Sequence, residues 1–158
     1  MSLPLTDQQR LELAEFAKIQ AQKVMSKIPL FGAVSWLMMQ QSGTRHTLLS
    51  ELEWRVMPAL VADQAKLYLR HDAPLAYVSW ARLSDEAEER YKNHPHHLVS
   101  SDWKSGDHNW IVDLFTPFGG ASDIINELRN TVFKGQALNQ FSVAADGKLS
   151  VITWPALT

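Results

Sequence analysis

The residue whose type and position most suggest chemistry is Asp113, which lies inside the apolar run of Trp110, Ile111, Val112 and Leu114. Such a run predicts a short buried strand. A lone buried carboxylate is costly, so Asp113 must be ion-paired, open to a cleft or protonated. Titratable groups in such settings are often functional. The alternative is an Asp that merely caps or ends a strand.

Asp113 belongs to a longer signature, Asp102–Gly120, that combines two tryptophans, three aspartates and a Gly-Gly pair. Two further tryptophan-containing blocks precede it, Gly32–Leu37 and Pro74–Ser84. In this order, over about residues 32–154, the blocks resemble the RTX toxin-activating lysine acyltransferases, the hemolysin-activating family. The resemblance implies a GNAT-like fold. It also implies transfer of a fatty acyl chain from acyl carrier protein to internal lysines of an RTX protoxin.

Acylation of a lysine requires a neutral amine, and free lysine has a pKa of about 10.4. A histidine is a suitable base near neutral pH. A carboxylate can orient that base or the incoming amine, and backbone amides can stabilise the oxyanion. Asp113 aligns without a gap with the family's catalytic Asp, so the resemblance implies that Asp113 is the carboxylate.

The family's catalytic His falls on Thr44 when residues are counted back without gaps from Pro58-Ala59. Threonine has no basic nitrogen and cannot replace a general base. His46 lies two positions later, and we expect a loop adjustment to bring it into the site as the base. The alternative is that His46 is an ordinary exposed loop histidine.

Four further residues are candidates for binding the carrier or the substrate. Arg45 could contact a phosphopantetheine phosphate or an acidic carrier protein, although a solvated surface charge is the commoner case. Ser42 is a weaker candidate and could be a turn residue. Gly119 and Gly120 follow the predicted strand and precede a helix, where backbone can approach a ligand closely, but a tight turn would explain the pair equally well.

Several classes of site are disfavoured by composition. The chain has 158 residues and no cysteine, which excludes disulfides and Cys-based zinc sites. The cluster of His94, His96, His97 and His108 fits no standard zinc pattern, so no metal is predicted. The net charge of -2 gives no global signal for nucleic acid. No signal peptide or membrane-spanning run is recognised, so we expect a cytoplasmic protein without stable membrane insertion.

Periodicity and turn residues predict the elements that must position these residues. Helices are expected over 7–27, 33–41, 52–60, 85–92 and 121–133. Pro29 is expected to end the first of these helices. Strands are expected over 66–71, 75–83, 110–114, 141–145 and 149–154.

This order predicts a single α+β domain with a mixed α/β sheet. We expect a helical extension over 1–31 and the acyltransferase domain over 32–158. The extension could cover a core face or serve a dimer interface. The resemblance also implies a homodimer, and no bound cofactor beyond the acyl-phosphopantetheine arm of the carrier.

Three alternatives to acyl carrier protein-dependent transfer remain open. The first is a GNAT-type enzyme that uses acyl-CoA, although no basic-Gly-x-Gly loop is found. The second is a non-catalytic binding partner of an RTX protein, suggested by Thr44 at the position of the family's histidine. A metal-dependent hydrolase using the loop histidines is a weaker possibility.

Overall fold

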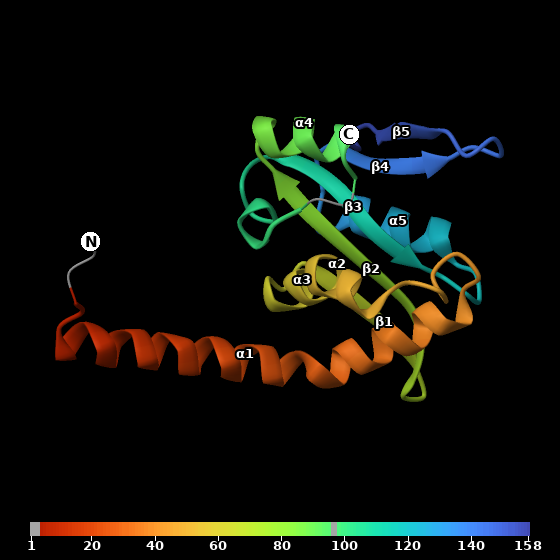
Figure 1. The fold of residues 1–158 in the computed structure, drawn as a ribbon. Helices are drawn as coiled ribbons and strands as arrows, with labels where there is room; N and C mark the ends of the chain where they lie inside the picture. The colour runs from red at the N-terminus through yellow and green to blue at the C-terminus, as the bar shows by residue number, and fades with distance from the viewer. Residues whose placement is uncertain (1–3, 96–97) are drawn as a thin grey trace.

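The computed structural model describes residues 4–95 and 98–158. Its centre is a five-stranded sheet in the order β1-β2-β3-β4-β5 (Figure 1). Adjacent strands are antiparallel except β3 and β4, which are parallel. The strands are β1 (Ala65–Arg70), β2 (Ala73–Leu83), β3 (His108–Phe115), β4 (Leu138–Val143) and β5 (Leu149–Trp154).

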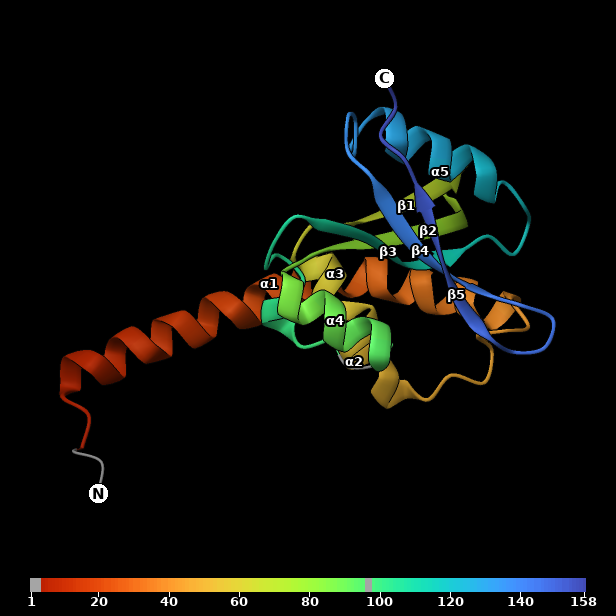
Figure 2. The same ribbon diagram turned by 90° about the horizontal axis from the view of Figure 1, so that it is seen from above.

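Helices cover both faces of this sheet. Figure 2 shows α5 on one face and the helices α1 to α4 on the other. The helices are α1 (Asp7–Gln40), α2 (Leu52–Arg55), α3 (Met57–Val61), α4 (Asp85–Asn93) and α5 (Ala121–Asn130), with 3-10 turns at Leu49–Glu51 and Ser100–Asp102. The prediction of a single α+β domain with a mixed sheet is confirmed, and the arrangement is consistent with a GNAT-like fold.

The alternation of side chains along the strands divides the core between the two faces. On one face Val78, Trp80 and Ile111 pack against Ile125 and Leu128 of α5. On the other face Tyr77 and Phe115 pack against α1, α2 and α3, while Ala81, Leu83 and Trp110 pack against α4 and the segment around Trp103. The second face therefore places α2 and α4 above the middle of β3.

The prediction that Pro29 ends the first helix is wrong, because α1 runs without interruption from Asp7 to Gln40 with Pro29 inside it. Proline removes one helical hydrogen bond and bends a helix, but does not oblige the chain to leave it. Figures 1 and 2 show such a bend. Burial of Val34, Leu37 and Met38 fixes the second half of the helix. The boundary expected between residues 31 and 32 falls inside α1, and a separate role for residues 1–31 stays a prediction.

The helix predicted over 52–60 is also interrupted. A 3-10 turn precedes the two short helices α2 and α3, and Pro58 lies in the first turn of α3. Proline is tolerated there because the first amides of a helix have no intrahelical acceptor. Arg55 is the last residue of α2, next to this break.

The sheet has two irregularities near the middle of β3. Strands β3 and β4 pair only at Trp110 with Asn139 and at Ile111 with Gln140, and Figure 1 shows the two strands diverging beyond this point. In addition, the register between β2 and β3 shifts between Ser79 and Trp80. The shift leaves Val112 as an extra residue on β3, which is a β-bulge.

Candidate active site

Asp113 lies on β3 beyond the point where β3 and β4 separate, and only 5% of it is exposed. Arg55 Nε donates to both carboxylate oxygens at 2.9 Å, and Arg55 Nη2 lies 2.8 Å from Oδ1. Such a fork of charge-assisted bonds is among the stronger polar contacts in proteins. The sequence-based requirement that Asp113 be paired, exposed or protonated is met by this ion pair.

Arg55 carries a positive charge into a site of low polarity. Burial acts to lower its pKa, but the hydrogen bonds and the charge of Asp113 outweigh burial, so the pKa of Arg55 is raised. The Arg55 guanidinium also lies 5.5 Å from the ring centroid of Phe115. These contacts keep Arg55 protonated and hold the carboxylate in one orientation.

The β-bulge at Val112 decides which way Asp113 points. Ile111 and Leu114 pack on the α5 face of the sheet, and Phe115 packs on the other. Regular alternation would put Asp113 on the α5 face with Ile111. The extra residue turns Asp113 to the face of α2, where Arg55 lies, and the backbone N–H of Asp113 donates to the Oγ of buried Ser79 at 3.2 Å. Bulges often re-aim a side chain in this way next to functional sites.

A cavity of about 310 Å³ opens beside Asp113 in the gap between β3 and β4. Its walls come from α2, α4 and the three strands β3, β4 and β5, and are mostly apolar. They consist of Trp54, Arg55, Tyr91, Pro95, Val112, Asp113, Phe141, Val143 and Leu149. Tyr91, Trp110 and Phe141 form a ring cluster at this wall, with centroids 4.9 to 5.3 Å apart. The arrangement is one charged pair at the side of an apolar cavity.

Two tyrosines close to Asp113 cannot serve as bases near neutral pH. Burial raises the pKa of Tyr77, and the negative charge of Asp113 raises it further. Burial and the same charge raise the pKa of Tyr91. Both side chains therefore remain protonated and can only donate or accept hydrogen bonds.

His46 lies in the turn that follows α1, and its side chain is exposed. Within the described residues the Asp113 carboxylate contacts Arg55, and no hydrogen bond or ion pair joins it to His46. The structure therefore does not bring the two predicted catalytic residues into contact. The turn is nevertheless tied to the end of β3, because the Thr116 amide donates to Oε1 of Gln41 at 3.1 Å. The role of His46 as a base stays a prediction.

Thr44, at the position of the family's histidine, has a structural role in this chain. Its side chain is buried and its hydroxyl donates to the carbonyl of Met38 at 2.8 Å. The carbonyls of the last helical turn lack intrahelical partners, so this bond helps to end α1. Thr44 stabilises the turn that carries His46.

The predicted carrier-binding residues Ser42 and Arg45 lie in the same turn, and both are exposed. Arg45 lines a cavity of about 350 Å³ that is largely apolar, together with Met38, Met39 and Leu52. The structure thus places Arg45 at the rim of a hollow beside the end of α1. Its binding role stays a prediction.

Gly119 and Gly120 form the turn between β3 and α5, with φ angles of 92° and 93°. Residues that carry a side chain rarely adopt such positive φ angles, which explains glycine at both positions. The turn packs against α1, since the rings of Phe118 and Trp36 have centroids 6.3 Å apart. Gly120 is the N-cap of α5. The alternative of a tight turn is therefore confirmed, and a contact with substrate stays a prediction.

The first half of the signature is structural. Trp103 is buried, and Asp102 accepts hydrogen bonds from Arg90 and from the Val99 amide. A Cβ on Gly106 would lie 2.5 Å from the carbonyl oxygen of Leu83, so only glycine fits this approach. These residues hold the segment between α4 and β3 against the rest of the fold.

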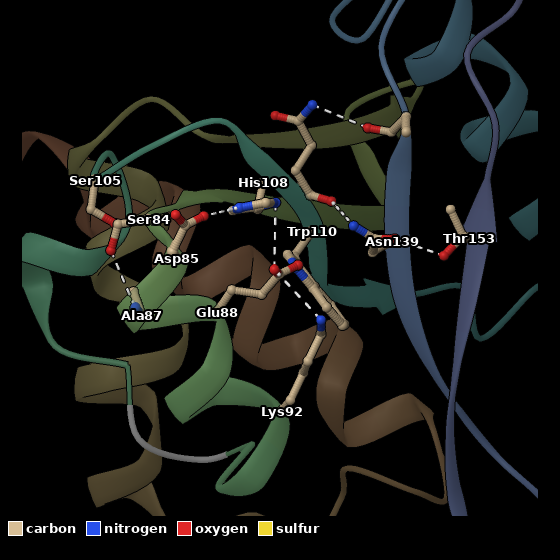
Figure 3. Close-up of polar contacts among 12 residues, drawn as sticks. Ser84, Asp85, Ala87, Glu88, Lys92, Ser105, His108, Trp110, Asn139 and Thr153 are labelled. Carbon is tan, nitrogen blue, oxygen red and sulfur yellow. Dashed lines mark hydrogen bonds and ion pairs between the residues drawn. The ribbon is translucent and has the colours of Figure 1, made fainter.

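A second polar cluster joins α4 to the start of β3 (Figure 3). His108 Nε2 lies 2.5 Å from Asp85 Oδ1, and His108 Nδ1 lies 3.4 Å from Glu88 Oε2. Glu88 also accepts from Trp110 Nε1 at 2.8 Å and pairs with Lys92. The hydrogen bond to Asp85 and the nearby carboxylates raise the pKa of His108. The cluster fixes α4 against the strand that carries Asp113.

Residues 4–95 and 98–158 contain no group of three or more metal-ligating side chains that could hold an ion. His96 and His97 of the predicted histidine cluster lie outside the described residues. No helix in the described part of the chain is long and apolar enough to cross a membrane.

The fold and the site define a class of α+β protein in which two parallel strands separate beside a buried acidic residue. The chain belongs to the RTX toxin acyltransferase family, whose model matches residues 23–155.

Three relatives illustrate this membership. The chain is 39% identical over 102 residues to the protein-lysine myristoyltransferase HlyC of Escherichia coli, covering 65% of this chain and 60% of the relative. It is 33% identical to the protein-lysine myristoyltransferase RtxC of Kingella kingae, and the match covers 80% of this chain and 77% of that relative. It is 31% identical to the RTX-I toxin-activating lysine-acyltransferase ApxIC of Actinobacillus pleuropneumoniae, covering 83% and 76%. The match to HlyC thus spans less than two thirds of that relative's length.

Sequence reasoning missed two residues of the site. Arg55 is 58 positions from Asp113, and no local pattern relates them. Ser79 could have been recognised, because it lies in the block Pro74–Ser84 that carries part of the resemblance. Ser79 belongs to the site because its hydroxyl oxygen accepts a hydrogen bond from the backbone N–H of Asp113.

Proposed function

We propose that this chain is a protein-lysine acyltransferase that moves a fatty acyl chain from acyl carrier protein to internal lysines of an RTX protoxin. The observation that carries the proposal is the placement of the family's aspartate, Asp113, in an ion pair at the side of an apolar cavity. Membership of the family and the names of the relatives support the same reaction. The protein would act in the cytoplasm as a homodimer.

The proposed reaction is an acyl transfer between sulfur and nitrogen. The neutral lysine Nζ attacks the thioester carbonyl, a C–N bond forms, and the C–S bond breaks to release the carrier's thiol. The base, for which we propose His46, accepts the proton lost from nitrogen, and a proton returns to the departing sulfur. No bound cofactor is needed beyond the phosphopantetheine arm that carries the acyl chain.

Asp113 is better suited to orienting groups than to removing a proton, because Arg55 occupies both carboxylate oxygens. We therefore propose that Asp113 orients or polarises the reacting groups and that Arg55 positions Asp113. The apolar walls formed by Trp54, Phe141 and Leu149 suit the first carbons of an acyl chain.

Arg45, Ser42 and the backbone at Gly119 and Gly120 are proposed to contact the carrier or its arm. All four lie in the two turns that adjoin at the end of β3. The contacts of Gln41 with Thr116 and of Trp36 with Phe118 join these turns.

The test is mass spectrometry of the candidate protoxin, expressed with and without this chain and with three variants. Wild type should add a fatty-acyl mass to lysine. His46→Ala and Asp113→Asn should abolish the addition, and Thr44→Val should retain it because Thr44 only ends a helix. Full transfer by His46→Ala would show that His46 is not the base. In vitro transfer from acyl-CoA but not from acyl carrier protein would favour the acyl-CoA-dependent alternative.

The second candidate function is a non-catalytic binding partner of an RTX protein. It is favoured by the buried hydroxyl of Thr44 at the position where the family has its base. This function predicts tight binding of the protoxin with no added mass. A pull-down combined with the same mass measurement distinguishes the two functions.

A further inference from the structure

A further cavity lies between α1, α3 and the segment 100–104, and we call it the Trp103 cavity after the buried tryptophan in its wall. Figures 1 and 2 show α3 beside the middle of α1, where two sides of the cavity are formed. Its volume is about 460 Å³, which is within the range of small-molecule sites. It shares no lining residue with the cavity beside Asp113.

Trp103 brings an unsatisfied hydrogen-bond donor to this cavity. Its side chain lines the cavity, although only 1% of the residue is exposed. Within the described residues, its indole Nε1–H has no hydrogen-bond acceptor. A buried donor without an acceptor costs free energy, which a ligand with an acceptor oxygen can recover. The Trp103 cavity therefore fits a ligand that supplies such an oxygen.

The other polar groups at the cavity are mostly donors as well. Lys23 of α1 and Lys104 line it together with the hydroxyl groups of Ser100 and Ser101. Glu53 is the acid of the lining, so the charge of the lining is 2 − 1 = +1. Donors from two distant parts of the chain thus meet at one cavity.

Asp63 shows that the two lysines lie near each other. Lys27 donates to Asp63 at 2.7 Å, and this hydrogen bond is the largest cause that lowers the pKa of Asp63. The charges of Lys23 and Lys104 lower that pKa further, so both ammonium groups lie near Asp63. Because Lys27 and Asp63 neutralise each other, the charge that remains at the cavity is complementary to a monoanion.

The rest of the wall is largely apolar. Four partly buried side chains line it, Val24 from α1 and Met57, Pro58 and Val61 from α3. An apolar chain placed against these side chains would be removed from water, which is favourable. A short anion would use the donors and leave this wall uncovered, whereas a neutral apolar molecule would leave the indole N–H without an acceptor.

We propose that the Trp103 cavity binds a free fatty acid, with the carboxylate at Trp103 Nε1, Lys23 and Lys104 and the chain between α1 and α3. A carboxylate matches the charge of +1 at the cavity. A phosphate monoester carries about −1.5 to −2 at neutral pH and is the poorer match. The proposal concerns a second site and does not depend on acyl transfer.

NMR of the indole N–H groups tests the proposal directly. The chain contains six tryptophans, and Trp103→Phe identifies the signal of Trp103 by its loss. Laurate should shift this signal. Acetate, which lacks the chain, and dodecanol, which lacks the charge, should not shift it at the same concentration. If laurate shifts the signals of Phe141 and Leu149 and leaves the Trp103 indole unchanged, the fatty acid binds beside Asp113 and the proposal is overturned.

Calorimetry with laurate provides a second test, in variants that keep Trp103. Lys23→Gln/Lys104→Gln should raise the Kd of laurate about tenfold. The control is Lys18→Gln, since Lys18 is exposed on the same helix and does not line the cavity. An affinity that is unchanged in the double variant, or no binding of laurate to the wild-type chain up to about 1 mM, would overturn the proposal.

The apolar wall is tested in the same assay. Val24→Glu should abolish binding, because it places a second negative charge beside the chain of the ligand. Gln22→Glu adds the same charge to α1 at an exposed position outside the cavity and should bind laurate as the wild-type chain does. Equal affinities of the two variants would show that the fatty acid does not lie between α1 and α3. Neither measurement uses an acyl donor or a protoxin, so its outcome is independent of the proposed acyl transfer.

Discussion

Asp113 and Arg55 form the ion pair on which the geometry of the site depends. The side chain of Asp113 is 5% exposed and that of Arg55 is 20% exposed, so neither charge is well solvated alone. Removing one member of a buried pair leaves the other charge uncompensated, whereas replacing both by apolar groups is often close to neutral.

The first prediction concerns the stability of this pair. Arg55→Met should lower the free energy of unfolding by about 3 kcal/mol, and Arg55→Met/Asp113→Leu should recover most of the loss. Urea denaturation measures both. The control is Lys27→Met, which removes an exposed pair with Asp63 and should change stability by less than about 1 kcal/mol. Equal losses in the single and double variants would show that the ion pair is not the cause.

The second prediction concerns the titration of His108. Asp85→Asn should lower the pKa of His108 toward its ordinary value, because the hydrogen bond to Asp85 is the largest cause of the raised pKa. Asp107→Asn is the control, since Asp107 is exposed and is not among the groups that shift the pKa of His108. NMR titration of the imidazole measures the shift. An unchanged pKa in Asp85→Asn would contradict the assignment.

The sign of the stability effect follows from the direction of that shift. A histidine whose pKa is raised by folding stabilises the protein fully below its unfolded pKa of about 6.5, and the contribution is lost as pH rises through the folded pKa. The difference in unfolding free energy between wild type and Asp85→Asn should therefore be largest below about pH 6.5 and absent above the folded pKa.

At the scale of elements, turns and irregularities decide where the predicted site residues point. The bulge in β3 turns Asp113 toward α2, and Gly119 and Gly120 let the chain pass from β3 into α5. Both glycines adopt positive φ, although a Cβ at either would meet nothing within 4 Å. Glycine is therefore required at both positions because of the backbone conformation and not because space for a side chain is lacking.

The third prediction separates these two reasons for glycine. Gly120→Ala should lower the free energy of unfolding by about 1–2 kcal/mol because its φ is 93°. Gly43→Ala, also with open space around a Cβ but without a positive φ, should be within about 0.5 kcal/mol of wild type. Thermal and urea unfolding provide the comparison. Similar losses at both glycines would contradict the conformational explanation.

At the scale of the whole molecule, the cavity beside Asp113 is assembled from α2, α4 and three strands. The β4–β5 hairpin supplies Phe141, Val143 and Leu149 to its wall. The exposed fractions of Val143 and Leu149 are 67% and 51%, so the rim is both apolar and accessible. In the proposed reaction, the fatty acyl chain enters the cavity over this hairpin.

The fourth prediction tests that rim. In the proposed reaction, Leu149→Glu should raise the KM for acyl carrier protein carrying a long acyl chain, because the charge is placed against the apolar wall. The unfolding midpoint should stay unchanged. Val151→Glu is the control on the same strand, since Val151 is 42% exposed and does not line the cavity. Steady-state kinetics with short and long chains measures the effect. Equal kinetics for both variants would exclude the hairpin from acyl binding.

The sequence by itself predicted most of the elements and the burial of Asp113. The helices expected over 85–92 and 121–133 and the strand expected over 149–154 rest on local patterns, and they correspond to α4, α5 and β5. The blocks around Trp36, Trp80 and Trp110 were sufficient to indicate the family. Helix ends near proline were predicted less well, because tertiary packing of Val34, Leu37 and Met38 outweighs the local penalty of Pro29.

Only the tertiary structure decided how the site is built. The pairing of Asp113 with Arg55 depends on a contact between distant residues, and the bulge that aims Asp113 depends on sheet register. Periodicity records which side of its own element a residue occupies. Periodicity does not indicate which side chain of another element faces that residue, because this contact depends on the packing of the whole chain.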